Sequence, residues 1–90
     1  MALLELLGRR WTLRLLWELR DGPLTFRALR AATEDVSPSV LNERLAELRG
    51  HELVDLTEDG YALTERGRSL SVLLLELDVW ARKHRFGDRD

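Results

Sequence analysis

The sequence contains no cysteine, two prolines, two histidines and a single lysine. Without cysteine it has no disulfide framework, no thiolate metal site and no thiol redox sensor. The two histidines, His51 and His84, stand far apart in the sequence, and no nucleophile is paired with a base. We therefore expect neither an enzyme nor a bound metal or other cofactor.

Long hydrophobic runs are absent as well. No apolar stretch approaches the roughly 20 residues that cross a bilayer, and the first residues lack the basic start and the cleavage site of a signal peptide. The 90 residues, 44% hydrophobic and 33% charged, are instead typical of one compact domain over residues 1–90. We expect a cytoplasmic protein that has no membrane partner.

The net charge of −2 is distributed unevenly. Residues 51–63 hold four acidic side chains and no basic one, whereas residues 1–20 hold four arginines and two glutamates. Thirteen of the fourteen basic residues are arginine, which favours forked contacts to phosphate, although GC-rich codon usage produces the same bias. The distribution of charge therefore says more about partners than the sum does.

Two short helices joined by a tight turn are predicted over residues 23–50. Thr25 is placed to cap the first helix. Ser37 and Pro38 open the second, because serine accepts a free backbone N–H at the cap and proline at the first helical position has no N–H to lose. Gly50 is expected to end this helix in a left-handed conformation. The core-facing stripe of the second helix consists of Val40, Leu41, Leu45 and Leu48.

A short β-hairpin is predicted directly afterwards, over residues 53–63. Asp59-Gly60 is the dipeptide that best suits a two-residue type I′ loop, and this loop sets Glu58 opposite Tyr61. One face of the hairpin then carries four apolar side chains: Val54, Leu56, Tyr61 and Leu63. Two helices, a tight turn and a hairpin in this order predict a winged helix-turn-helix, a mainly α fold with a small β-hairpin that reads DNA.

The first 20 residues carry two further apolar helices. The first stops near Gly8, and Thr12 is expected to cap the second, which ends before the break at residues 20–23. Both helices are too apolar for a solvated surface. We expect them to pack in the core and at a dimer interface.

A long C-terminal helix is predicted over residues 64–86, with Thr64 at its start. Its apolar residues form one stripe of Leu70, Leu73, Leu74, Leu77 and Trp80, and a second stripe of Val72, Leu75 and Val79. One stripe can close the core of the domain, and the other needs a partner, most often a second copy of the chain. We therefore expect a homodimer that pairs the N-terminal and C-terminal helices through Leu3, Leu4, Leu7, Val72, Leu75, Val79 and Trp80.

Several segments together carry a family pattern. They are Leu7-Gly8-Arg9-Arg10-Trp11-Thr12, Gly22-Pro23-Leu24-Thr25-Phe26-Arg27-Ala28-Leu29, Val36-Ser37-Pro38-Ser39-Val40-Leu41-Asn42-Glu43-Arg44-Leu45 and Leu63-Thr64-Glu65-Arg66-Gly67. In order and spacing they resemble the HxlR family of bacterial winged-helix transcriptional regulators, from about Leu3 to about Trp80. The resemblance implies a dimer that binds double-stranded operator DNA, with its first and last helices at the dimer interface and the helix over residues 38–49 in the major groove.

The sequence departs from that family at three places. Family members commonly carry a cysteine shortly before the first helix, which senses electrophiles in some of them, and this sequence has none. The family hairpin is usually longer and basic toward its tip, whereas no base lies between Arg49 and Arg66 here. The position of Ser39 is often basic or larger in relatives. We expect a weak or absent wing contact, because carboxylates and phosphates repel.

The outward face of the helix over residues 38–49 supplies the candidate base contacts. Asn42 can pair with adenine, Glu43 can accept a hydrogen bond from a cytosine amino group, and Ser39 can bond a base edge or a phosphate. The alternative is that these are ordinary polar residues on a solvated face. The family resemblance favours the functional interpretation.

Phosphate contacts are predicted from both helices. Arg44 reaches either a phosphate, which we favour, or an internal carboxylate such as Glu47 or Glu34. Arg27, with the free N–H groups of its helix, can contact the DNA backbone, and Thr25 adds a hydroxyl unless it serves only as a cap. The full candidate DNA-binding set is Thr25, Arg27, Ser37, Ser39, Asn42, Glu43 and Arg44.

A second function from a different class is also open. A winged-helix protein with reduced DNA binding can act through a protein partner or a small ligand, and the acidic hairpin favours this hypothesis. Trp11, Trp17 and Trp80 come from the elements expected at the dimer interface, where they can line a cavity for a flat aromatic effector. More often, such tryptophans are core or interface packing.

Overall fold

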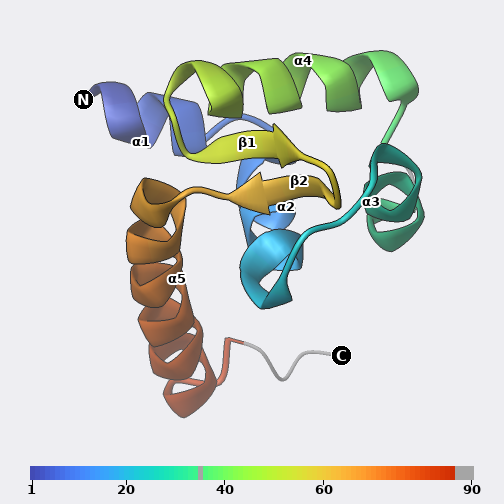
Figure 1. The fold of residues 1–90 in the computed structure, drawn as a ribbon. Helices are drawn as coiled ribbons and strands as arrows, with labels where there is room; N and C mark the ends of the chain where they lie inside the picture. The colour runs from blue at the N-terminus through green and yellow to red at the C-terminus, as the bar shows by residue number, and fades with distance from the viewer. Residues whose placement is uncertain (35, 87–90) are drawn as a thin grey trace.

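The computed structural model describes residues 1–34 and 36–86 as helices arranged around a small hairpin (Figure 1). The elements in chain order are α1 (Ala2–Leu7), α2 (Thr12–Glu18), the 3₁₀ turn η1 (Leu19–Asp21), α3 (Phe26–Thr33), α4 (Pro38–Gly50), β1 (Val54–Thr57), β2 (Gly60–Leu63) and α5 (Glu65–Lys83). The fold is a winged helix-turn-helix, as the sequence predicts. None of the helices in the described ranges is long and apolar enough to cross a bilayer.

Three predicted caps set the starts of α3, α4 and α5. The hydroxyl of Thr25 accepts the N–H of Ala28 at 3.1 Å, and that of Ser37 accepts the N–H of Val40 at 3.2 Å. The hydroxyl of Thr64 accepts the N–H of Gly67 at 3.0 Å. Each bond satisfies one of the backbone donors that a helix start leaves free. These three predictions are confirmed.

The core lies between α2, α3, α4 and the hairpin. From α4 it receives the predicted stripe, with Leu41, Leu45 and Leu48 buried and Val40 half-buried. The other buried apolar side chains are Leu6, Leu15, Leu16, Leu19, Leu29, Val36, Leu53, Val54 and Leu63. Burying one face of α4 in this way leaves its opposite face outward.

The α4 helix ends differently from the prediction. Gly50 is the last helical residue, and the left-handed residue is Glu52, at φ 62°. The N–H of Glu52 donates to the carbonyl of Arg49 at 2.9 Å, and the N–H of Leu53 donates to the carbonyl of Leu48 at 3.0 Å. This pair of bonds is a Schellman ending, in which the buried Leu48 and Leu53 supply the accompanying apolar contact.

The hairpin forms in a register two residues away from the predicted one. Thr57 pairs with Gly60 and Leu56 with Tyr61, so the loop is Glu58-Asp59, and neither loop residue has the positive φ of a type I′ turn. The Thr57 hydroxyl accepts the N–H of Asp59 at 3.1 Å and donates to the carbonyl of Gly60 at 2.8 Å, which closes this turn instead. A shift of two preserves the predicted faces.

Gly60 allows the backbone of Leu24 to approach β2 closely, and it does not form the hairpin loop. Leu24 pairs with Tyr61 through backbone hydrogen bonds of 2.9 and 2.8 Å, which places the residue before Thr25 against β2. A Cβ on Gly60, whose φ is 118°, would lie 2.6 Å from the backbone of Leu24. The hairpin is thereby fixed to the start of α3.

The predictions for Thr12 and α5 need correction. Thr12 is the fully buried first residue of α2, and the N-cap position belongs to Trp11, at φ 80°. The C-terminal helix ends at Lys83 and turns Gly67 and Ser71 inward, with Leu70 and Leu74 packed against the core. The first predicted stripe is therefore split, because the exposed side chains now include Leu73, Leu77 and Trp80 as well as Val72, Leu75 and Val79.

Candidate nucleic-acid interface

The outward face of α4 carries the polar residues proposed to read bases. Ser39, Asn42 and Glu43 are all exposed, and Asn42 makes no side-chain hydrogen bond within residues 1–34 and 36–86. Their exposure follows from the opposite stripe, which burial in the core holds inward. The Ser37 hydroxyl is engaged as the helix cap and lies 3.4 Å from the Ser39 hydroxyl. Exposed polar side chains on an outward helix face are what base contacts in a major groove require, and of the three only Glu43 is held by a charged neighbour in the described part of the chain, Arg44 at 3.2 Å.

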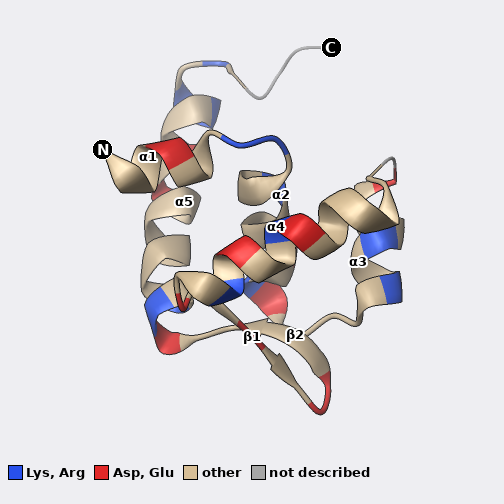
Figure 2. Cartoon of the chain, turned by 90° about the horizontal axis from the view of Figure 1, so that it is seen from above, with Lys and Arg blue, Asp and Glu red and all other residues tan. Residues whose placement is uncertain are grey.

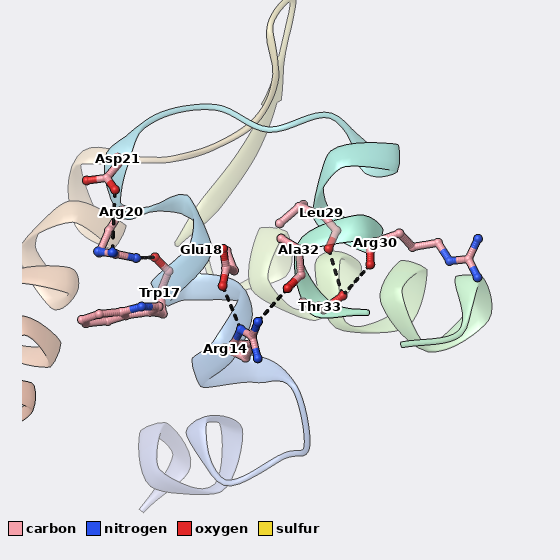
Figure 3. Close-up of polar contacts among 9 residues, drawn as sticks. All are labelled: Arg14, Trp17, Glu18, Arg20, Asp21, Leu29, Arg30, Ala32 and Thr33. Atoms are coloured by element: carbon pink, nitrogen blue, oxygen red, sulfur yellow. Dashed lines mark hydrogen bonds and ion pairs between the residues drawn. The ribbon is translucent and has the colours of Figure 1, made fainter. Parts of the chain in front are cut away.

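The α3 helix is held in place by side chains from α2 and from α3 itself (Figure 3). Arg14 donates to the carbonyl of Ala32 at 2.6 Å and to the carboxylate of Glu18 at 2.8 Å. The buried hydroxyl of Thr33 donates back to the carbonyl of Leu29 at 2.9 Å. The bond from Arg14 satisfies a carbonyl in the last turn of α3, after which Glu34 ends the helix at φ 68°.

The side chain of Arg44 is mostly buried against the protein, which differs from the favoured prediction that it contacts a phosphate. Its side chain is only 14% exposed. The guanidinium donates to the carbonyl of Arg10 at 2.9 Å and to the carboxylate of Glu43 at 3.2 Å, and it lies 3.5 Å from the carboxylate of Glu47. Of the two alternatives weighed for Arg44, the structure favours the internal carboxylate, and that carboxylate is Glu47 rather than Glu34.

Glu47 joins two parts of the fold through two arginines, a role that its sequence position does not indicate. One carboxylate oxygen lies 3.5 Å from the guanidinium of Arg44, and the other lies 3.5 Å from that of Arg9. Arg9 precedes α2, so this cluster ties α4 to the connection between α1 and α2. Arg44 of the same cluster also bonds the carbonyl of Arg10, 34 residues away in the sequence. Sequence patterns, which relate nearby residues, do not predict a contact over this separation.

Two arginines remain available on α3. Arg27 makes no hydrogen bond or ion pair with the described residues, and Arg30 makes one long contact, 3.4 Å to the carbonyl of Val36. Figure 2 shows these basic positions on α3 and the acidic turn of the hairpin. Arg49 at the end of α4 lies 3.8 Å from Asp55 of β1. The arginines that remain available for phosphate contacts are therefore Arg27 and Arg30 on α3.

The three tryptophans do not come together within one chain. Trp17 lies under the guanidinium of Arg20, 4.1 Å from it, and Trp80 stacks on His84 at 4.4 Å between ring centres. Trp11 packs against the core. In the part of the chain that the structure describes, no two of these indoles form an aromatic pair. A cavity lined by all three at a dimer interface stays a prediction.

Within the described ranges, no group of three or more His, Cys, Asp or Glu side chains is placed to hold a metal ion. What the residues do present is a helix-turn-helix with a free polar face and an adjoining hairpin. The model of the HxlR-like helix-turn-helix family matches residues 6–88. The chain belongs to this family. The resemblance noted from the sequence segments is thus confirmed.

Two known proteins show how close the similarity is. The HTH-type transcriptional regulator YodB of Bacillus subtilis is 36% identical over 84 residues, which cover 86% of this chain and 75% of YodB. The crystal structure of quinone-bound YodB matches with a TM-score of 0.84 at 34% identity, over 91% of this chain and 93% of that one. A possible HxlR family transcriptional factor from Thermoplasma volcanium matches with a TM-score of 0.71 at 31% identity, over 91% and 84% of the two chains.

Proposed function

We propose that this HxlR-like regulator is a homodimer that binds operator DNA in the cytoplasm with α4 in the major groove. The observation that carries the proposal is the exposed outward face of α4, where Asn42 makes no side-chain hydrogen bond within residues 1–34 and 36–86 and lies opposite a stripe of buried leucines. The protein acts by binding and not by catalysis. Asn42 and Glu43 read base edges, and Ser39 contacts a base edge or a phosphate.

Backbone contacts come from α3 and the start of α4. Arg27 and Arg30 neutralise phosphates, and the free N–H groups at the start of α3 add contacts near Thr25, whose own hydroxyl oxygen already accepts as a cap. Ser37 likewise serves first as a cap. The hairpin makes a weak contact or none, because its turn carries Glu58 and Asp59 and phosphates repel carboxylates.

The dimer is proposed from the apolar surface of α5 and α1. Six large apolar side chains of α5 are 42–59% exposed, and Leu4 of α1 is 61% exposed. Leu3 is also exposed, whereas Leu7 packs against the core of its own domain. An apolar surface of this extent is uncommon on a soluble monomer. A second copy related by a two-fold axis covers it and sets two α4 helices against two half-sites.

Selection of bound sequences from a genomic DNA pool tests the proposed function. We expect the enriched sites to share a palindromic motif, since a two-fold dimer reads two equivalent half-sites. Recovery of no sequence preference at low salt would contradict the proposal. In that case the second function, a protein with reduced DNA binding, would be favoured.

Replacing Asn42 with alanine is expected to relax base preference at one position in each half-site. The loss of paired hydrogen bonds to one base should reduce discrimination there by about tenfold, while preference at the other positions stays unchanged. Repeating the selection with the variant measures this effect. The control is Glu5→Ala on α1, which should leave the motif intact.

Replacing Arg44 with alanine is expected to lower stability more than DNA binding. The change removes a hydrogen bond to the Arg10 carbonyl and leaves Glu47 with one cation, which should cost about 2 kcal/mol, or about 10 °C in melting temperature. Arg49→Ala is the matched control on the same helix, since Arg49 is 47% exposed and should cost less than about 1 kcal/mol. Normal stability with uniformly weakened binding would instead assign Arg44 to phosphate.

Placing two arginines on the outer face of α5 is expected to separate the dimer. The double variant Leu75→Arg and Val79→Arg changes two side chains that are 42% and 57% exposed, so the fold of each chain should persist. Sedimentation at micromolar concentration should change from the mass of two chains to that of one, and operator affinity should fall more than about tenfold because one half-site is lost. Leu56→Arg, at an exposed hairpin position, serves as the control. A monomeric unaltered protein would refute the dimer.

Small-molecule binding is a second candidate function, and the quinone-bound structure of YodB favours it. The chain has no cysteine, so a covalent thiol adduct is not available to it. A ligand must therefore be held by shape and by polar contacts. The three tryptophans at a dimer interface are one candidate site, and a hollow within one chain is another.

A further inference from the structure

A hollow of about 360 Å³ lies between α1, the segment after α4, and the first half of α5. Its volume is in the range of small-molecule sites. The buried side chains of Leu6 and Leu53 form its floor, while the more exposed Leu3 and Leu73 form opposite walls. The floor therefore belongs to the domain core, and the walls belong to helices that can adjust to an occupant.

The polar side chains that accompany the apolar lining can all donate hydrogen bonds, and one of them is an arginine. The polar side chains at the hollow are His51, Arg66 and Ser69, and no aspartate or glutamate lines it. All three are exposed, and none of them makes a side-chain hydrogen bond or ion pair within the ranges that the structure describes. In a chain with a net charge of −2, a hollow with a free guanidinium and no carboxylate is complementary to an anion.

A neighbouring hollow differs from the first one in that acidic side chains line it. It lies on the other side of α1 and shares Leu6 and His51, but it also contains Glu5 and Glu47. Its one arginine, Arg9, is already paired with Glu47 at 3.5 Å. That hollow has no free cation for an anionic ligand, whereas the first one has Arg66.

We propose that the hollow between α1 and α5 binds a small apolar monocarboxylate. The ring or chain of the acid packs on Leu6 and Leu53, and its carboxylate accepts hydrogen bonds from Arg66, whose planar donor pair matches a carboxylate. Ser69, one turn further along α5, and His51 supply further donors. The proposal deepens the second candidate function and does not depend on DNA binding.

The position of the hollow connects a ligand to the rest of the molecule. His51 directly follows α4, and its N–H donates to the carbonyl of Glu47 in that helix at 3.1 Å. The N–H of Leu53 likewise donates to the carbonyl of Leu48 at 3.0 Å. A ligand on these residues touches the end of α4 and, through Leu3 and Leu73, both helices of the proposed dimer. Binding there is therefore placed to change the spacing of the two α4 helices.

Titration with 2-naphthoate, followed by backbone amide NMR of the full chain without DNA, tests the proposal. We expect saturable shifts confined to residues 2–6, 51–53 and 66–73, with a dissociation constant on the order of 0.1 mM. The neutral 2-naphthamide should bind at least about tenfold more weakly, because it lacks the charge that Arg66 recognises. Because the titration contains no DNA, its failure would leave the proposed operator binding untouched.

Two variants of Arg66 distinguish recognition of the carboxylate from nonspecific apolar binding. Arg66→Gln should weaken 2-naphthoate binding about tenfold, and Arg66→Lys, which keeps the charge but not the planar donor pair, should restore only part of the affinity. Arg27→Gln, the same change at an exposed arginine on α3, should have no effect. Equal binding of acid and amide, or unchanged affinity in Arg66→Gln, would overturn the proposal. Shifts of residues 51–53, which lie outside the proposed dimer surface, with protein concentration alone would also overturn it, because a second copy would then fill the hollow.

Discussion

Replacing Gly67 with alanine is expected to lower the free energy of unfolding by about 3 kcal/mol or more. An added Cβ at this position would lie 2.1 Å from the carbonyl oxygen of Leu53 and 3.1 Å from its carbonyl carbon. These atoms belong to backbone, so no flexible side chain can move aside, and α5 must be displaced from the core. In thermal unfolding, the melting temperature should drop by about 15 °C.

Gly50 provides the matched control for this prediction. It is also a helical glycine, but a Cβ there would meet nothing within 4 Å. Gly50→Ala should therefore leave stability unchanged or raise it by about 0.5 kcal/mol, since alanine has the better helix propensity. Similar melting temperatures for the two variants would contradict the close packing of α5 on Leu53.

Gly67 also gives a physical reason for one of the family-like segments. The segment Leu63-Thr64-Glu65-Arg66-Gly67 contains the cap of α5 and the glycine that lets this helix approach the chain. Thr64 contributes twice, because its hydroxyl also donates to the carbonyl of Glu52 at 2.6 Å. The short segment thus fixes the direction of α5 relative to the end of α4.

Local chemistry explains which parts of the fold are predictable. The caps at Thr25, Ser37 and Thr64 involve bonds that span three residues, so residue type and spacing suffice to find them. The buried stripe of α4 also follows from one helical period. These features are enough to identify the helix-turn-helix and its outward face.

The incorrect predictions depend on contacts between distant segments. The hairpin register is set partly by Leu24, whose backbone leaves no room for a side chain at Gly60. The orientation of α5 follows from the small residues Gly67 and Ser71, which a search for leucine stripes passes over. Thr12 is buried where a capping residue was expected. In each case tertiary packing overrides a reasonable local preference.

In the candidate site, too, some features follow from local sequence and others depend on distant contacts. Exposure of Ser39, Asn42 and Glu43 follows from helical period alone, and the structure places all three outward. The environment of Arg44 depends on Arg10, 34 residues away, and on Arg9 through their shared partner Glu47. The structure thereby reduces the number of cations available to phosphates and concentrates them on α3.

Operator affinity is expected to fall roughly 150-fold between 50 and 200 mM salt. Each released counterion contributes a slope of about −0.9 in the logarithm of affinity against the logarithm of salt concentration. Arg27 and Arg30 of each helix-turn-helix give about four neutralised phosphates per dimer, and hence a slope near −3.6. An acidic hairpin adds nothing to this number. A wing inserted among phosphates by additional cations would make the slope steeper.

The salt dependence of binding to the selected operator tests the central claim, that the helices and not the wing bind DNA. Affinities for the operator and for a scrambled duplex of equal length should be measured from 50 to 200 mM salt. We expect a slope near −3.6 for the operator, with the operator bound at least about a thousandfold more tightly than the scrambled duplex. Equal affinities for the two duplexes at every salt concentration, or an operator affinity independent of salt, would contradict the claim.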